Sequence, residues 1–158
     1  MWALFEINWQ LEVSENESHQ LYRCLKPRPC LSPYLLELPF YDRRAITRYI
    51  CRCNYLPTSS FQRFYDPDFR PTCFICEEEI GDEVHLLLRC PYFERHRRRL
   101  PEIFANLPDG DDLERFVNIL HTDDIELLRK LARLLGTILD VCEFDATIDR
   151  YAAVLVYN

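Results

Sequence analysis

Four residues in the middle of the chain constrain its fold more than any other feature. Cys73, Cys76, His85 and Cys90 form the pattern C-x2-C-x8-H-x4-C within eighteen residues. Thiolate and imidazole are the ligands that tetrahedral zinc prefers, and a closed set of four is typical of structural sites. The spacing therefore predicts that this segment folds around one Zn²⁺ ion.

Composition favours a helical fold. The chain has 158 residues, of which 48% are hydrophobic and 13% aromatic, enough for one domain with a core. It contains only three glycines, whereas all-β sandwiches and barrels need many turn residues with positive φ. These features predict a small, single-domain, mainly α protein organised around a zinc knuckle.

The start of the chain and its cysteines bear on the cellular compartment. Residues 1–13 do not resemble a signal peptide, and no segment reaches the roughly 18 to 20 apolar residues of a membrane span. We therefore predict an intracellular protein, in the nucleus or cytoplasm, that is not secreted and does not enter a membrane. Thiols stay reduced there, which favours metal binding over disulfides. The cysteines outside the motif are predicted to be small buried hydrophobic residues: Cys24, Cys30, Cys51, Cys53 and Cys142.

Charge divides the chain into three regions. Residues 1–22 hold four acidic side chains and no Lys or Arg, residues 23–100 hold 14 basic and 10 acidic ones, and residues 101–158 hold 5 basic and 12 acidic ones. This predicts an N-terminal acidic segment, a basic helical region that contains the knuckle segment (residues 73–90), and an acidic C-terminal helical region that packs on it. The basic middle fits nucleic-acid binding, and equally fits attraction between the regions of the chain.

Periodicity predicts the elements before the knuckle segment. Apolar residues occupy every odd position from 3 to 13, which favours a short N-terminal strand or hairpin without excluding a helix. Residues 42–56 show helical spacing, with Asp42 as the N-cap and arginines every four residues. Residues 59–65 favour a shorter helix.

Further helices are predicted from the knuckle segment onward. Asp82 caps a short helix over residues 83–89, which carries His85 inward and delivers Cys90 at its end. Residues 113–120 form a helix after an aspartate cap. Residues 125–142 carry a broad apolar stripe, typical of a long helix that packs on the rest of the chain or self-associates. The last apolar stretch, residues 151–157, fits a short helix or a strand.

The motif and its surroundings resemble a known family. The cysteine pair is followed by an acidic loop, by the segment Glu83-Val84-His85-Leu86-Leu87-Leu88-x-Cys90-Pro91 and by an arginine-rich stretch. This order looks like the CCHC zinc-knuckle region near the C-terminus of non-LTR retrotransposon reverse transcriptases, over residues 20–142 and specifically over residues 73–99. The resemblance implies a non-catalytic knuckle that helps to hold template RNA or target DNA. No Tyr-x-Asp-Asp polymerase segment is present, so the chain would correspond to a detached fragment without the polymerase domain.

We therefore predict a non-catalytic zinc-binding module that contacts the phosphates of RNA or DNA without reading bases. The arginines predicted to make these contacts are Arg44, Arg48, Arg52, Arg89, Arg95, Arg97, Arg98 and Arg99. One alternative is a protein–protein interaction module with a purely structural zinc, whose acidic C-terminal helices recruit a partner. A weaker alternative is a metal-dependent endonuclease that uses Asp109 and Asp123, although the sequence between them favours a turn and a helix over the strands of such a nuclease.

Overall fold

The structure, a computed structural model, describes residues 2–15, 20–26, 28–53, 56, 58, 71–105 and 107–156. In this part of the chain every regular element is a helix, and the only β pairing is one isolated antiparallel bridge. The elements are α1 (Trp2–Glu15), α2 (Gln20–Leu25), α3 (Pro33–Glu37), α4 (Phe40–Ile50), a π-helix (His85–Arg89), a 3-10 helix (Pro91–Phe93), α6 (Glu94–Arg97), α7 (Pro101–Phe104), α8 (Asp112–Leu120) and α9 (Ile125–Val156). The prediction of a small, mainly α, single-domain protein is confirmed.

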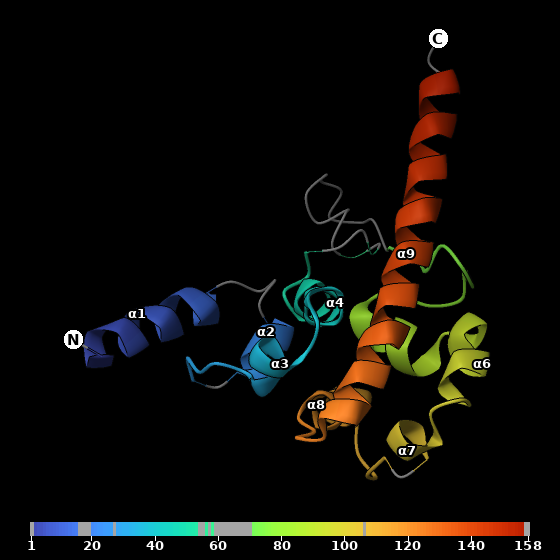
Figure 1. Ribbon diagram of the computed structural model, residues 1–158. Coiled ribbons are helices and arrows are strands. Elements are labelled where there is room, and N and C mark those ends of the chain that lie inside the picture. The colour runs from blue at the N-terminus through green and yellow to red at the C-terminus, as the bar shows by residue number, and fades with distance from the viewer. Residues whose placement is uncertain are drawn as a thin grey trace.

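The core is built where α9 packs against α4 (Figure 1). The apolar stripe predicted for residues 125–142 is the face that α9 buries. Its buried side chains are Leu128, Leu131, Leu134, Leu135, Ile138, Leu139 and Cys142. On α4, Ile46, Tyr49 and Ile50 are buried at helical spacing. Because each buried Leu or Ile contributes about 1.5–3 kcal/mol, these residues supply much of the driving force for folding. Self-association through residues 125–142 stays a prediction.

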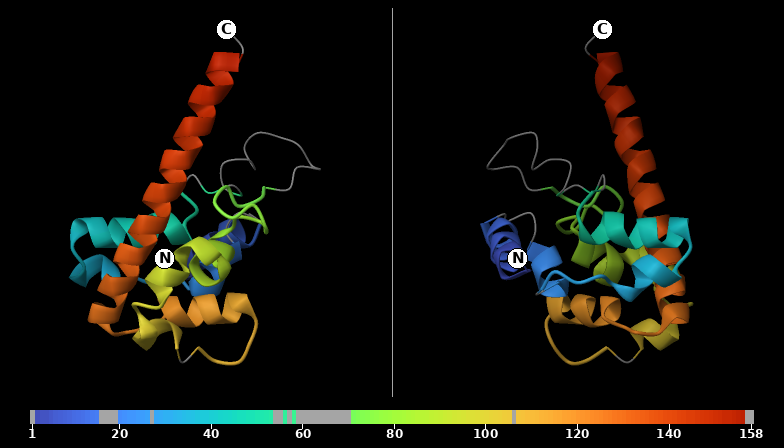
Figure 2. Two further views of the ribbon diagram at one scale, coloured as in Figure 1. Left: turned by 90° about the vertical axis from the view of Figure 1, so that its right-hand side faces the viewer. Right: turned by 60° about the vertical axis from the view of Figure 1, so that its left-hand side comes forward.

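The last helix is longer than its sequence pattern indicates. α9 runs without a break to Val156, so residues 151–156 belong to this helix and not to a separate helix or strand. Figures 1 and 2 show its C-terminal part extending away from the other helices, while its N-terminal half lies among α4, α7 and α8.

The predicted N-terminal strand is wrong, because the segment forms helix α1. Residues 2–15 contain no Gly or Pro and include several good helix formers. A lone strand would leave its backbone N–H and C=O groups without partners, whereas a helix pairs them internally. The alternating apolar residues then spread around the helix: Ile7 and Leu11 are exposed, and Val13 is buried.

Helix α4 begins two residues earlier than predicted. Its N-cap is Pro39, so Asp42 is not the cap but lies in the first turn, where a carboxylate interacts favourably with the helix dipole. The helix ends at Ile50, and Arg52 follows with a left-handed backbone at φ 55°. This reversal stops the helix before residue 56. The helix predicted at residues 59–65 lies outside the described residues.

The cysteines outside the motif differ from the prediction. Cys24, Cys30 and Cys53 are exposed and Cys51 is half-buried, so that the buried hydrophobic role holds only for Cys142. The exposed ones lie at the edge of α2 and in the connections that flank α3 and α4, where little of the core covers them. Among the helices of the described residues, none is both long and apolar enough to cross a membrane. The region boundaries drawn from charge stay predictions.

Candidate metal centre

The first two ligands lie in a tight turn whose base is closed by the isolated β-bridge. The Cys73 N–H donates to the Glu79 carbonyl at 2.7 Å, and the Glu77 N–H donates to the Cys73 carbonyl at 2.9 Å. Glu77 takes a left-handed conformation, with φ 59°, which reverses the chain. The turn brings Cys73 and Cys76 together and returns the chain toward the next helix.

The other two ligands are separated by one π-helical turn. The Asp82 carboxylate accepts from the His85 N–H at 2.7 Å, so Asp82 caps this helical segment as predicted. The Cys90 N–H donates to the His85 carbonyl, five residues back, at 2.7 Å. In an α-helix, residues five apart lie about 140° apart around the axis. The wider π turn brings His85 and Cys90 to one side, which explains the x4 spacing that the sequence shows.

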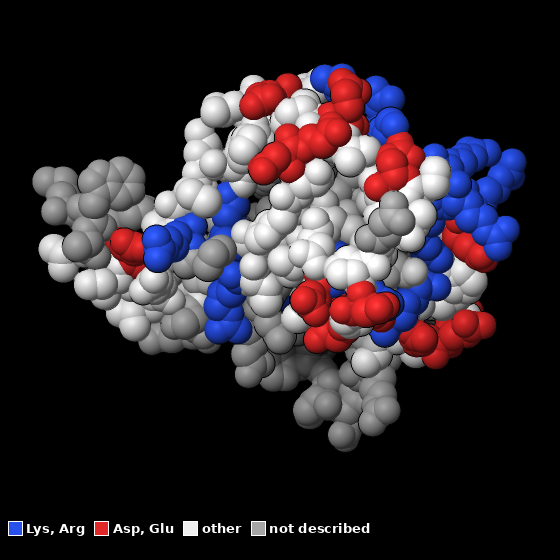
Figure 3. Space-filling view, turned by 90° about the horizontal axis from the view of Figure 1, so that it is seen from below, with Lys and Arg blue, Asp and Glu red and all other residues white. Residues whose placement is uncertain are grey.

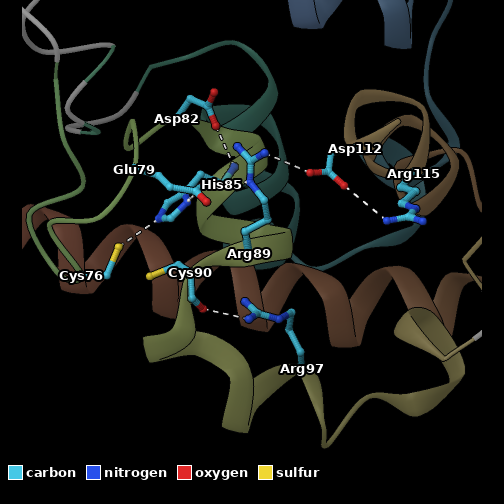
Figure 4. Close-up of polar contacts among 9 residues, drawn as sticks. All are labelled: Cys76, Glu79, Asp82, His85, Arg89, Cys90, Arg97, Asp112 and Arg115. Carbon is cyan, nitrogen blue, oxygen red and sulfur yellow. Dashed lines mark hydrogen bonds and ion pairs between the residues drawn. The ribbon is translucent and has the colours of Figure 1, made fainter. Parts of the chain in front are cut away.

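The four side chains converge on one point. Their ligand atoms, three sulfurs and one imidazole nitrogen, all lie within 4.8 Å of one another. Cys76 Sγ is 3.3 Å from His85 Nε2 (Figure 4). Two ligands of a tetrahedral zinc ion lie about 3.5–3.8 Å apart, so that a small adjustment would seat such an ion. The group can therefore hold a metal ion, as the sequence pattern predicted.

Burial and ligand number define the kind of metal site. Cys73, His85 and Cys90 are buried, and Cys76 is half-buried. Four protein ligands leave no open position for water or substrate, which is typical of a structural metal and not of a catalytic one. Without a cation, this surrounding disfavours thiolates: burial raises the pKa of Cys73 to about 12, against hydrogen bonds from the Cys76 and Ile75 backbone that lower it. Burial also raises the pKa of Cys90. A bound cation would offset this cost and release protons.

Glu79 orients the imidazole ligand. His85 Nδ1 lies 3.0 Å from Glu79 Oε2, on the opposite side of the ring from Cys76 (Figure 4). A carboxylate can only accept, so Nδ1 carries the proton and Nε2 presents its lone pair to the other ligands. Glu79 was not predicted as a site residue. Its position in the acidic loop between the ligand pairs is the only sequence signal for this role.

The same carboxylate connects the site to α8. Arg89 Nε lies 3.0 Å from Glu79 Oε2, and its Nη1 lies 3.1 Å from Asp112 Oδ2. Arg115 pairs with the other oxygen of Asp112 at 3.4 Å. These groups are partly exposed, so each pair contributes little to stability, but together they restrict the position of Glu79. Arg89, predicted to contact phosphate, is thus directed at carboxylates of its own chain.

Arg97 supports the last ligand through the backbone. Its half-buried guanidinium donates to the Cys90 carbonyl at 2.8 Å (Figure 4). It also donates to the Leu87 carbonyl at 3.5 Å. The carbonyls at the end of a helix have no partner within it, and Arg97 contacts that of Leu87. The Cys90 carbonyl, directly after the π-helix, also accepts from the Phe93 N–H at 3.2 Å. Sequence reasoning placed Arg97 among the phosphate contacts, because only the folded chain turns it back toward the site.

Helix α4 holds the metal-binding segment from the other side. Tyr49 is fully buried and its hydroxyl donates to the Glu83 carbonyl at 2.7 Å. Arg52 Nε lies 3.1 Å from Glu83 Oε1, and only 4% of the Glu83 side chain is exposed. Leu86 and Leu87, one turn further, are completely buried. They belong to the same buried apolar cluster as Cys73 and Cys90, and Leu88, which follows them, is half-buried.

Among the predicted nucleic-acid contacts, five arginines have polar partners within the chain. Arg52, Arg89 and Arg97 are described above, Arg48 lies 3.3 Å from Glu143, and Arg98 pairs with Glu94 on α6. The remaining three are exposed and form no ion pair with any described residue: Arg44, Arg95 and Arg99. Phosphate contact by the set of eight stays a prediction.

The residues of the nuclease alternative do not form a comparable group. Asp109 and Asp123 are exposed and lie at opposite ends of α8, in the turns before and after it. The Asp111 carboxylate accepts from the Glu114 N–H at 2.7 Å, so it is the cap of this helix. Among the described residues, the Cys3His group is the only cluster of three or more His, Cys, Asp or Glu side chains that could hold a metal.

Comparison with protein-family models, with curated proteins and with solved structures gave no match. The resemblance to the retrotransposon knuckle therefore rests on the sequence motif alone. The fold and the site define the chain as a small helical protein with a Cys3His group able to hold a metal.

We expect Glu79→Gln to weaken metal binding by about 10- to 100-fold, because loss of an outer-shell partner of a histidine ligand usually has this effect. Glutamine cannot accept from Nδ1 as strongly and does not pair with Arg89. The measurement is competition for the metal against a chromophoric chelator. Glu78→Gln is the matched control, since Glu78 is an exposed neighbour in the same loop. Equal affinities for the two variants would contradict the orienting role of Glu79.

Proposed function

We propose that this chain is a non-catalytic module in which a zinc ion, bound by Cys73, Cys76, His85 and Cys90, holds helices together and presents a basic surface to RNA or DNA. The observation that carries the zinc part is the convergence of three thiols and one oriented imidazole within 4.8 Å. Soft ligands in a closed tetrahedral set favour zinc over magnesium, calcium or manganese, which prefer oxygen. The reduced thiols that such a site needs favour a nuclear or cytoplasmic location.

The nucleic-acid part is supported by the residues that follow the last ligand. Arg95, Arg98 and Arg99 are exposed, and 76% of the Arg98 side chain is accessible despite its pair with Glu94. Figure 3 shows Lys and Arg side chains gathered at the right-hand edge of the face seen from below, on the side where α6 lies in Figure 1. An exposed pair on a helix surface is weak and can give way to a phosphate. Arg95 lies on α6, and Arg98 and Arg99 directly follow it; we name these three residues the α6 arginines.

An exposed aromatic ring lies directly before the α6 arginines. Tyr92 is 56% exposed, whereas Phe93, beside it, is completely buried. Stacking of a base on an exposed ring contributes about 1–3 kcal/mol and tolerates any sequence. Tyr92 with the α6 arginines would therefore favour single-stranded RNA or DNA. This agrees with the family that the motif resembles, whose knuckle is taken to hold a nucleic-acid strand.

A second candidate function is protein–protein interaction with a purely structural zinc. Leu36, on α3, is 70% exposed, and Phe40 and Tyr41, at the start of α4, are 57% and 78% exposed. Exposed apolar and aromatic side chains close in sequence are common at protein interfaces. The net charge of −7 also opposes long-range attraction of nucleic acid. In this alternative the α6 arginines would only keep the surface soluble.

The test uses the full chain, purified without added zinc, with metal stoichiometry measured first. Binding to a single-stranded RNA and DNA of mixed sequence is then followed by fluorescence anisotropy over a range of salt. Replacing the three α6 arginines by glutamine should lower the affinity at least about tenfold and reduce the slope of log affinity against log salt by about 2. The reason is that three phosphate contacts, each with its counterion release, would be lost.

A matched control removes three exposed charges elsewhere: Arg28→Gln, Lys130→Gln and Arg133→Gln. Both triple variants have the same net charge, so equal losses would indicate only a general charge effect and would contradict the surface proposed here. If the protein binds zinc stoichiometrically but has no affinity for RNA or DNA, the metal centre is supported, the nucleic-acid function is contradicted and the protein-interaction function is favoured.

A further inference from the structure

Lys26, which lies outside the metal centre, is an unusually buried lysine. Only 8% of this residue is exposed, although lysine is almost never so buried without a partner of opposite charge. Its ammonium donates to the Cys30 carbonyl at 2.8 Å and lies 3.9 Å from Cys30 Sγ. It forms no ion pair with any Asp or Glu of the described residues. Two of its three N–H donors thus have no strong acceptor in the part of the chain that the structure describes.

Lys26 lines a cavity of about 290 Å³. The cavity lies between the connection from α2 to α3 on one side and the turn from α8 to α9 on the other. Its inner wall is apolar, with Ile46 and Ile50 from α4 and Leu128 from α9, and all three are buried. An apolar cavity with a few polar groups at fixed positions is the usual form of a small-molecule site.

Of the charged and imidazole groups that line the cavity, only Lys26 is placed to bind a ligand strongly. His121 is held by a hydrogen bond between its Nε2 and the Leu25 carbonyl at 3.0 Å, so this nitrogen is occupied. Asp123 also lines the cavity, but it is exposed to solvent and does not pair with Lys26. Water screens a charge at the rim much more than one in the interior. The ammonium of Lys26 is therefore the group that would select a ligand.

We propose that this cavity binds a small organic carboxylate with an apolar body, and that Lys26 is its counter-ion. The carboxylate would accept the two remaining ammonium N–H groups, and the body would cover the wall formed by Ile46, Ile50 and Leu128. A charge-assisted hydrogen bond of this kind is stronger than one between neutral groups, and an ammonium buried without it is costly. This site is independent of the metal ligands and of the α6 arginines.

The test uses the metal-loaded full chain and two carboxylate probes that differ in their apolar part. Hexanoate has a flexible aliphatic chain, and phenylacetate has an aromatic ring. Hexanamide and phenylacetamide are the uncharged controls of the same shape. Binding is followed by calorimetry and by amide shifts of Lys26, Ser32 and His121 in two-dimensional NMR spectra. At least one carboxylate should bind roughly tenfold or more tightly than its amide. The probe that binds better identifies the class of body.

Variants assign the effect to Lys26. Lys26→Met keeps the apolar stem and should remove the preference for the carboxylate, whereas Lys26→Arg should retain it. Arg133→Met, on an exposed part of α9, is the control and should leave binding unchanged. Lys26→Met should fold, since it replaces a buried charge by an apolar side chain; its thermal unfolding is measured alongside. The proposal is overturned if neither carboxylate binds up to about ten millimolar, if the amides bind equally well, or if Lys26→Met binds as the native chain does.

Discussion

Replacement of Cys90 by serine should release the metal and unfold the knuckle segment. Cys90 is fully buried and contributes one of the four ligand atoms. Serine has nearly the same shape but is a much poorer ligand for zinc. Structural zinc contributes folding free energy on the order of 10 kcal/mol, so the free energy of unfolding should fall by several kcal/mol. Metal stoichiometry by elemental analysis and thermal unfolding by circular dichroism measure the two effects.

The matched control is Cys142→Ser, because Cys142 is also buried but lies outside the ligand group. This control measures the cost of a buried hydroxyl, about 1–3 kcal/mol, and should leave the metal stoichiometry unchanged. A Cys90→Ser protein that retains one tightly bound metal and loses no more stability than the control would rule out the metal centre as described.

The second large effect is expected for Arg52→Met. Arg52 neutralises the Glu83 carboxylate, whose side chain is only 4% exposed. Removing one partner of a buried ion pair takes away the pairing of a charge that stays buried, and costs about 3–5 kcal/mol. Methionine keeps the apolar stem of arginine, so that packing changes little. The free energy of unfolding is measured by chemical denaturation of the metal-loaded protein.

Two further variants separate charge from packing. Arg48→Met, in the last turn of α4, breaks an ion pair with Glu143, which is 45% exposed, and should cost about 1 kcal/mol or less. Adding Glu83→Gln to Arg52→Met removes the buried carboxylate charge and should restore part of the loss. If Arg52→Met is as stable as the native chain, Glu83 is not held by this pair, and Arg52 returns to the group of arginines available for phosphate.

Local signals were sufficient for much of the site. The ligand spacing predicted which four side chains meet, and Asp82 was predicted as a cap because a short acceptor before a helix satisfies its first N–H groups. An aspartate cap was also predicted before residue 113, and the structure shows that Asp111 is this cap. The long helix followed from the spacing of its apolar residues. Each of these signals involves residues close together in the sequence, and can therefore be recognised without knowledge of the fold.

Other features depend on contacts that no local pattern contains. The alternation at the N-terminus indicated a strand, but pairing decides whether a strand is stable, and the structure has a helix there. The π turn between His85 and Cys90 is compatible with the spacing but not specified by it. Glu79 and Arg97 act on the ligands only once the loop and α6 have folded back on them.

The eight arginines predicted to bind nucleic acid show most clearly which properties follow from the sequence and which depend on the tertiary structure. Their number and positions, and the ligands beside them, can be read from the chain itself, because residue identity defines both charge and metal preference. Which of them remain exposed is a property of packing: Arg52 pairs with a residue 31 positions away and Arg48 with one 95 positions away. Such pairs form only when α4 lies against the metal-binding segment and α9, since an ion pair is strong only at short distance and away from water.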